Sequence, residues 1–113
     1  MHELSITESI IKICSEEACK NKASKVKSIK IVIGDLTGLI PESIQYYFDI
    51  ASKETRVEGA KLIIEKMPIK IECRNCKAVT PIKRGIFACP KCNSDDISMI
   101  SGNEFYVDSM EVD

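Results

Sequence analysis

The fold is decided by two Cys-x-x-Cys pairs, Cys73-Arg74-Asn75-Cys76 and, after residues 77–88, Cys89-Pro90-Lys91-Cys92. Two pairs at this distance are typical of one four-cysteine metal site, because each pair brings two thiolates together and the short segment between them lets the second pair fold back onto the first. We predict a structural zinc ion here, since four sulfur ligands fill the tetrahedron and leave no position for water or substrate. Any other chemistry is expected elsewhere in the chain.

Length and charge limit the alternatives. A chain of 113 residues, 44% apolar, can build one ordinary core and a metal-stabilised module, but not two independent cores. The net charge of −1 argues against a nucleic-acid-binding protein, which usually has a clear excess of basic residues. Residues 73–92 do contain five basic side chains and no acid. We interpret them as cations that offset the charge of −2 expected for four thiolates and Zn²⁺, although a phosphate-binding patch is the alternative.

The cysteines and the start of the chain predict a cytoplasmic protein. No apolar run approaches the about 18 residues of a membrane span, and Met1-His2-Glu3 lacks the features of a signal peptide. In a reducing cytosol the paired cysteines are expected to bind metal rather than form disulfides. Cys14 and Cys19 are predicted to lie on different faces of one helix, with Cys14 in the core and Cys19 near the surface.

Apolar periodicity outlines the secondary structure. Ser5-Ile6-Thr7-Glu8 fits a capping box, so a helix is predicted over about 5–21, with residues 1–3 before its first turn. A second helix is predicted from Pro41 to about residue 53. Strands are predicted over 26–33, 62–67 and 104–112, and Pro68 interrupts the second of these runs before residues 69–72 enter the cysteine module.

This order predicts an α+β fold, a small mixed β-sheet covered by two helices, with an inserted four-cysteine zinc-ribbon module. The predicted domains are residues 1–68 plus 102–113 and, for zinc, residues 69–101, with Pro68 as a candidate joint.

His2 is the only histidine in the chain. A histidine at position two can combine its imidazole with the terminal amine, here that of Met1, and with deprotonated backbone amides, and such a nitrogen-rich, near-planar set favours Ni(II) or Cu(II) over Zn(II). Catalysis is not indicated, because the chain has no phosphate-binding loop of the Gly-x-x-x-x-Gly-Lys type and no histidine besides His2 for a catalytic triad. We therefore predict a metal-binding protein and not an enzyme.

Four short motifs follow one another along the chain: Met1-His2-Glu3, Ile33-Gly34-Asp35 through Pro41-Glu42-Ser43, the two cysteine pairs, and Gly102-Asn103-Glu104. With these motifs, the whole chain resembles the HypA family of hydrogenase maturation proteins. Each motif is short, and the ordered combination is what makes the resemblance specific.

The resemblance implies a nickel metallochaperone that carries Ni²⁺ as transient cargo to the large subunit of [NiFe]-hydrogenase, together with a nucleotide hydrolase of the HypB type. It implies nickel ligands from the His2 side chain and from the backbone nitrogens of His2 and Glu3. Some relatives add a carboxylate from the loop before the second helix, but residues 36–40 contain no acid here. Asp35 and Glu42 flank this loop and are interpreted as loop and helix-start residues.

Two other interpretations stay open. One is a zinc-ribbon protein or nucleic-acid interaction module without a nickel function, which the basic residues near the cysteines favour and the net charge opposes. The other is an iron electron carrier, since four thiolates also bind iron and Cys89-Pro90-Lys91-Cys92 resembles a rubredoxin knuckle. Neither explains the Met-His-Glu start.

Overall fold

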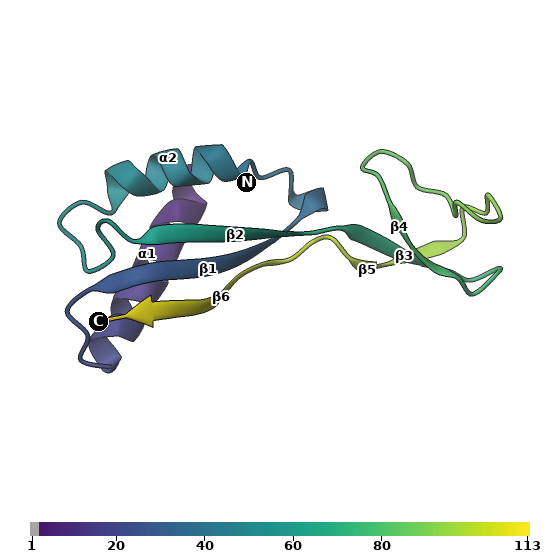
Figure 1. The fold of residues 1–113 in the computed structure, drawn as a ribbon. Helices are drawn as coiled ribbons and strands as arrows, with labels where there is room; N and C mark the ends of the chain where they lie inside the picture. Colours follow the sequence, from purple (N-terminus) through teal and green to yellow (C-terminus); the bar gives the residue numbers. More distant parts are fainter. Residues whose placement is uncertain (1–2) are drawn as a thin grey trace. The chain divides into compact units, whose positions relative to one another are not determined.

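The computed structural model describes residues 3–113; Met1 and His2 lie outside the described part. The elements are α1 (Glu3–Lys20), β1 (Val26–Gly34), the 3₁₀ turn η1 (Asp35–Thr37), α2 (Pro41–Ala51), β2 (Lys61–Met67), β3 (Ile69–Cys73), β4 (Val79–Ile82), β5 (Ile97–Ser101) and β6 (Phe105–Val112) (Figure 1). The chain forms two compact units. Unit 1 consists of residues 1–32, 39–65 and 106–113, and unit 2 of residues 33–38 and 66–105.

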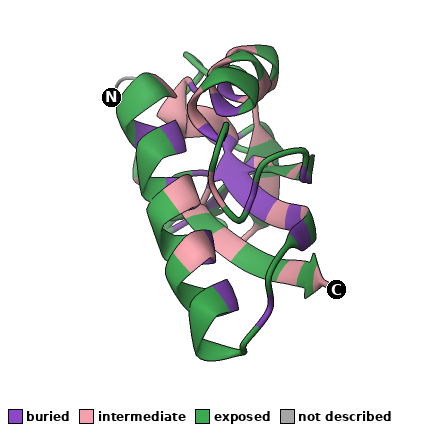
Figure 2. Cartoon of the chain, turned by 90° about the vertical axis from the view of Figure 1, so that its left-hand side faces the viewer, coloured by how far each residue is buried: buried purple, intermediate pink, exposed green. Residues whose placement is uncertain are grey.

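The two helices of unit 1 pack against each other. Helix α1 buries Ile6, Ile10, Cys14 and Ala18, which recur every four residues and so lie on one stripe. Its outward surface is exposed (Figure 2). Helix α2 begins at Pro41, as predicted, because proline at the first helical position removes an N–H that has no partner there.

The predicted start of α1 is wrong by two residues. The helix begins at Glu3, so Ser5 lies inside it and cannot be its N-cap. The carbonyl of Ser5 instead accepts a hydrogen bond from the Ser9 hydroxyl (3.1 Å), and the carbonyl of Glu3 accepts one from the buried Thr7 hydroxyl (2.6 Å). Glu3 is therefore part of the first turn and not outside it. Its N–H nevertheless belongs to the four first donors of a helix, which have no acceptor within the helix.

Unit 1 contains most of a three-stranded sheet with the order β2-β1-β6. Strand β6 runs antiparallel to β1, as the bonds from Asp113 N to Lys25 O (3.2 Å) and from Gly34 N to Glu104 O (2.8 Å) indicate. Strand β2 runs in the same direction as β1 (Figure 1), so the sheet is mixed, as predicted. The central strand places Ile29 and Ile31 in the core, both fully buried.

Unit 2 contains a second sheet with the order β4-β3-β5. Both pairings with β3 are antiparallel, and Ile71 lies opposite Thr80 on β4 and Met99 on β5. Strands β4 and β5 were not predicted from the sequence. The core of this sheet is small, and its β3 isoleucines, Ile69 and Ile71, are each 1% exposed.

A close backbone crossing lies within unit 2, where the end of β1 meets the connection between β5 and β6. Leu36 N donates to Gly102 O (2.8 Å), and Gly102 N donates to the Glu104 carboxylate (2.9 Å). A Cβ on Gly34 would overlap the backbone of Gly102 and Asn103. Glycine is required at position 34 because the second segment passes where a side chain would stand.

The α+β prediction, with two helices, small sheets and a four-cysteine cluster, is confirmed. The predicted domains, 1–68 plus 102–113 and 69–101, stay a prediction; the compact units divide the chain differently, since residues 33–38 belong with the cysteine region. Within residues 3–113, no helix combines the length and apolar character needed to cross a membrane.

Candidate metal centre

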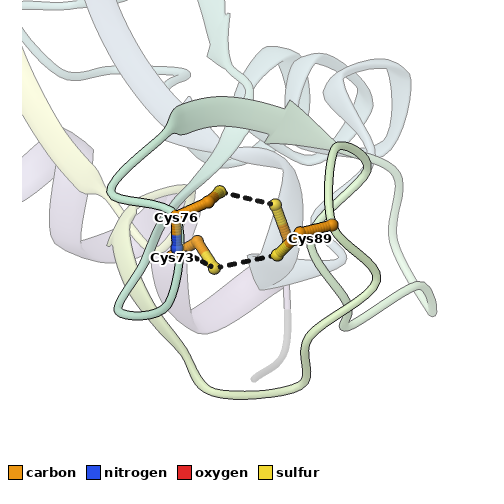
Figure 3. Close-up of side chains that lie close together, drawn as sticks. Cys73, Cys76 and Cys89 are labelled. Carbon is orange, nitrogen blue, oxygen red and sulfur yellow. Dashed lines mark hydrogen bonds between the residues drawn. The ribbon is translucent and has the colours of Figure 1, made fainter.

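Four cysteine sulfurs meet in unit 2. The Sγ atoms of Cys73, Cys76, Cys89 and Cys92 all lie within 4.8 Å of one another. Across the two pairs, Cys73 Sγ is 3.5 Å from Cys92 Sγ, and Cys76 Sγ is 3.6 Å from Cys89 Sγ. Figure 3 shows the labelled side chains turned toward one another. Cys73 ends β3, so the sheet fixes one corner of the cluster, and Cys89 and Cys92 come from the turns before β5.

Each cysteine pair forms a knuckle, and the two knuckles have the same backbone hydrogen bonds. In each, the N–H of the first cysteine donates to the carbonyl five residues later, and the N–H four residues later donates back to the carbonyl of that cysteine. The bonds are Cys73 N to Ala78 O (2.9 Å), Lys77 N to Cys73 O (2.9 Å), Cys89 N to Ser94 O (2.8 Å) and Asn93 N to Cys89 O (2.8 Å). Lys77 and Asn93 both take positive φ angles, 64° and 65°, which tighten the turns.

Backbone N–H groups inside the knuckles point at the sulfurs and favour thiolates. The backbone N–H of Cys92, followed in effect by that of Lys91, lowers the pKa of Cys89, and the N–H of Ser94 lowers the pKa of Cys92. For Cys76, the backbone N–H of Ala78 lowers the pKa, but desolvation and the neighbouring sulfurs outweigh it and raise the pKa to about 11. A bound cation would remove this obstacle to four thiolates, because it stabilises the negative charge.

This donor set fits zinc. A ZnS₄ tetrahedron with bonds of about 2.3 Å has edges of about 3.8 Å, close to the 3.5 and 3.6 Å between the paired sulfurs. Cys73 and Cys89 are buried, whereas Cys76 and Cys92 lie at the surface, so two ligands anchor the centre and two face solvent. With four protein ligands the tetrahedron is complete, and the chemistry available to such a centre is structural.

Side chains on the first knuckle link it to the second. The guanidinium of Arg74 pairs with the Asp96 carboxylate at 2.6 Å, and the backbone N–H of Arg74 donates to Asp96 O at 3.0 Å. Asn75 Nδ2 donates to Cys92 Sγ at 3.6 Å. Sequence reasoning grouped Arg74 with the basic residues near the cysteines and did not identify Asn75 or Asp96. No signal in the sequence pairs these residues, because their contacts depend on how the two knuckles meet.

The other cysteines lie where they were predicted. Cys14 is fully buried on α1 and Cys19 is exposed. Burial raises the pKa of the Cys14 thiol to about 11, so this thiol stays protonated at neutral pH. Cys14 is a core residue. Among the described residues, the four-sulfur cluster contains Cys73, Cys76, Cys89 and Cys92.

Two of the predicted nickel ligands, His2 and Met1, lie outside the described residues, and the third, Glu3, is the first residue of α1. The acids that flank the loop before α2 have structural positions, since Asp35 pairs with Lys66 at 3.4 Å and Glu42 lies in the first turn of α2. The nickel ligands His2, the Glu3 backbone nitrogen and the Met1 amine therefore stay a prediction.

This chain matches known proteins over its full length. The family described as "Hydrogenase/urease nickel incorporation, metallochaperone, hypA" matches residues 1–112. The hydrogenase maturation factor HypA of Dehalococcoides mccartyi is 40% identical over 113 residues, which cover 100% of this chain and 95% of that protein. The protein of the same name from Caldanaerobacter subterraneus is 39% identical over 114 residues, with both chains fully covered.

Solved structures support the same relationship. The solution structure of the Ni metallochaperone HypA from Helicobacter pylori has a TM-score of 0.68 at 30% identity and covers 99% of this chain and 97% of that one. A second solution structure of a HypA protein has a TM-score of 0.73 at 30% identity, with 99% and 96% covered. Sequence, fold and the four-cysteine centre thus agree, and the chain belongs to the HypA family of nickel-incorporation metallochaperones.

Proposed function

We propose that this protein is a nickel metallochaperone that binds Ni(II) at its N-terminus and delivers it during the maturation of [NiFe]-hydrogenase, while a structural zinc ion holds the four-cysteine centre. The observation that carries the proposal is the full-length family match combined with a cluster that already has four sulfur ligands. Because a closed sulfur tetrahedron offers no open position, the cargo needs another site, and the only histidine is at position two.

The proposed nickel ligands are the His2 imidazole, the backbone nitrogens of His2 and Glu3, and the Met1 amine. The position of Glu3 supports this set. As the first residue of α1, Glu3 has an N–H without an acceptor inside the helix, so deprotonating it for a metal breaks no helical hydrogen bond. All-nitrogen, near-planar coordination favours Ni(II), and ligands at a chain end suit a protein that has to give its metal up.

The proposal extends to partners and place of action. The acceptor would be the large subunit of [NiFe]-hydrogenase, and a nucleotide hydrolase of the HypB type would assist the transfer. The protein would act as a carrier and not as an enzyme. It would work in the cytoplasm, where reducing conditions keep the six cysteines from forming disulfides.

The test is a titration of Ni²⁺ into zinc-loaded protein, followed by heat and by d–d absorption. We expect wild type to bind about one equivalent, consistent with one nitrogen-rich site. The His2→Ala variant, which removes the only imidazole, should lose this binding. Glu3→Gln is the matched control, because it changes the carboxylate and keeps the backbone nitrogen, and it should bind as wild type does. Equal binding by wild type and His2→Ala would refute the N-terminal site and favour the zinc-ribbon interaction module.

Metal analysis of the purified protein tests the zinc assignment separately. We expect about one zinc per chain and no iron, as closed four-thiolate sites with this spacing usually hold zinc. A red protein that contains iron would instead support the electron-carrier interpretation.

A further inference from the structure

The two knuckles share their backbone bonds but differ at the third position of the Cys-x-x-Cys motif, which is Asn75 in the first and Lys91 in the second. Asn75 Nδ2 lies 3.6 Å from Cys92 Sγ and donates to it. Among the hydrogen bonds of residues 3–113, this is the contact in which a non-cysteine side chain donates to a cluster sulfur. Asn75 of the first knuckle therefore donates a side-chain hydrogen bond to the second knuckle, and the described residues contain no such bond in the reverse direction.

Cys92 is a corner of the centre that needs support. It lies nearer the surface than Cys73 and Cys89, which are buried. Cys76 is also exposed, and it receives no such side-chain bond among the described contacts. Cys92 and Cys76 can therefore be compared within one protein, since the Cys92 sulfur has an amide donor and the Cys76 sulfur does not.

The neighbours of Asn75 hold it in place. Arg74 is fixed to Asp96 by two contacts, one from its backbone N–H at 3.0 Å and one from its guanidinium at 2.6 Å. Asp96 follows the second knuckle, so this pair ties the first knuckle to the chain that leaves the second. Asn75 follows Arg74 directly in the chain, and its side chain reaches Cys92.

We propose that Asn75 is a positioning residue of the metal centre, whose amide N–H holds the Cys92 thiolate in place as a metal ligand and slows loss of the metal. The inference deepens the proposed function at its zinc site and is independent of the nickel site. A neutral amide suits this task, because its N–H dipole stabilises a negative sulfur while the amide does not replace sulfur on the metal. Removal of a hydrogen-bond donor to a metal ligand typically changes metal affinity about 10–100-fold.

The first experiment measures the rate at which zinc passes from the loaded protein to an excess of a coloured chelator. We expect Asn75→Ala to release zinc about ten-fold faster than wild type, the lower end of that range for one bond to an exposed ligand. The matched control is Lys91→Arg, which changes the side chain at the equivalent position of the other knuckle but keeps its positive charge, and it should release zinc at the wild-type rate. Equal rates for wild type, Asn75→Ala and Lys91→Arg would overturn the proposal.

A second readout separates support of one sulfur from general loosening of unit 2. Limited alkylation of zinc-loaded protein, mapped by mass spectrometry, should modify Cys92 faster in Asn75→Ala while Cys76 reacts as in wild type. Faster reaction of all four ligands to the same degree would mean that the variant only destabilises the fold, and would refute a specific role.

Two further measurements cover the case in which Asn75→Ala folds poorly. Asn75→Asp keeps the size of the side chain but replaces the donor with a carboxylate, so it should release zinc faster than Asn75→Gln, which keeps an amide. In wild type loaded with an NMR-active cadmium isotope, the Asn75 amide protons should show coupling to the metal through the sulfur. Absence of this coupling together with equal release from Asp and Gln variants would reject the inference. Purified protein without zinc would instead reject the zinc part of the proposed function.

Discussion

Unit 1 and unit 2 differ in what fills their interiors. Unit 1 encloses a continuous apolar core that includes Ile10, Ile29, Ile31 and Phe48, each less than 2% exposed. In the described part of unit 2, the buried hydrophobic side chains are three isoleucines and two cysteine ligands, Ile33, Ile69, Ile71, Cys73 and Cys89. So small a core rarely holds a fold together, whereas metal binding by an otherwise unstructured site contributes folding free energy directly. We therefore expect apolar burial to stabilise unit 1 and a bound metal ion to stabilise unit 2.

Removing zinc is the strongest test of this difference in how the two units are stabilised. Structural zinc contributes roughly 10–16 kcal/mol in zinc-finger peptides, which is as much as the entire stability of many domains. We expect amide protons of β3, β4 and β5 to lose hydrogen-exchange protection when a chelator removes the metal, while those of α1 and α2 keep theirs. Cys73→Ser should behave like the chelated protein, and Cys19→Ser, which changes an exposed thiol outside the cluster, should not. Persistent protection of β3 without metal would contradict the comparison.

Truncating the apolar core should affect unit 1 instead. Phe48 is fully buried on α2, and Phe48→Ala should cost about 3–5 kcal/mol in unfolding free energy because it leaves a large cavity. Urea unfolding followed by helical circular dichroism measures the loss. Tyr46→Ala is the control on the same helix, since Tyr46 is 62% exposed, and it should change stability by less than about 0.5 kcal/mol. Zinc content should stay the same in both variants, and loss of zinc in Phe48→Ala would contradict separate stabilisation.

High pH should weaken unit 1 through a thiol that binds no metal. The pKa of Cys14 is raised from 9.0 to about 11 by burial, so between these values the unfolded chain loses a proton that the folded chain keeps. The contribution of the protonated Cys14 thiol to the unfolding free energy is fully present below pH 9. It is lost as the pH rises toward 11, by up to about 1.4 kcal/mol per pH unit. Unfolding free energies of wild type and Cys14→Ala, measured from pH 8 to 11, should converge as the pH rises. Parallel curves would show that Cys14 titrates normally.

The smallest effect is expected at the ion pair beside the metal centre. The side chains of Arg74 and Asp96 are 58% and 60% exposed, so solvent screens their attraction. Arg74→Ala should lower the stability of zinc-loaded unit 2 by less than about 1 kcal/mol, and added salt should reduce the difference further. Thermal unfolding at low and high salt tests this. A loss of several kcal/mol would mean that the pair, and not the metal, fixes the first knuckle.

Elements with a repeating buried pattern could be predicted from the sequence. Helix α1 buries a residue at every third or fourth position, and β1 buries Ile29 and Ile31 at alternate positions, so local pattern and final structure agree. The start of α1 was wrong because a Ser-x-x-Glu pattern also occurs inside helices. Here Ser5 lies beyond the first residue, and its side chain does not decide where the helix begins.

Strands β4 and β5 could not be predicted because pairing with β3 creates them. Strand β4 is four residues long and contains Pro81, and its Val79 is 54% exposed, so it has no buried face to read. The cysteine spacing did predict that four sulfurs meet. It could not predict the bond from Asn75 to Cys92 or the pairing of Arg74 with Asp96, since both depend on how two turns distant in sequence approach each other.

The close backbone crossing at Gly34 and Gly102 constrains the order in which the chain can fold during synthesis. Residues 33–38 are made early, yet their bonds go to Gly102 and Glu104, and β1 also waits for β6 as its sheet partner. Neither unit can therefore complete its structure before residues 102–113 have left the ribosome. The cysteines at 73–92 emerge before that point. The four cysteine ligands are thus all present before the strand that finishes the sheet of unit 1 has been made.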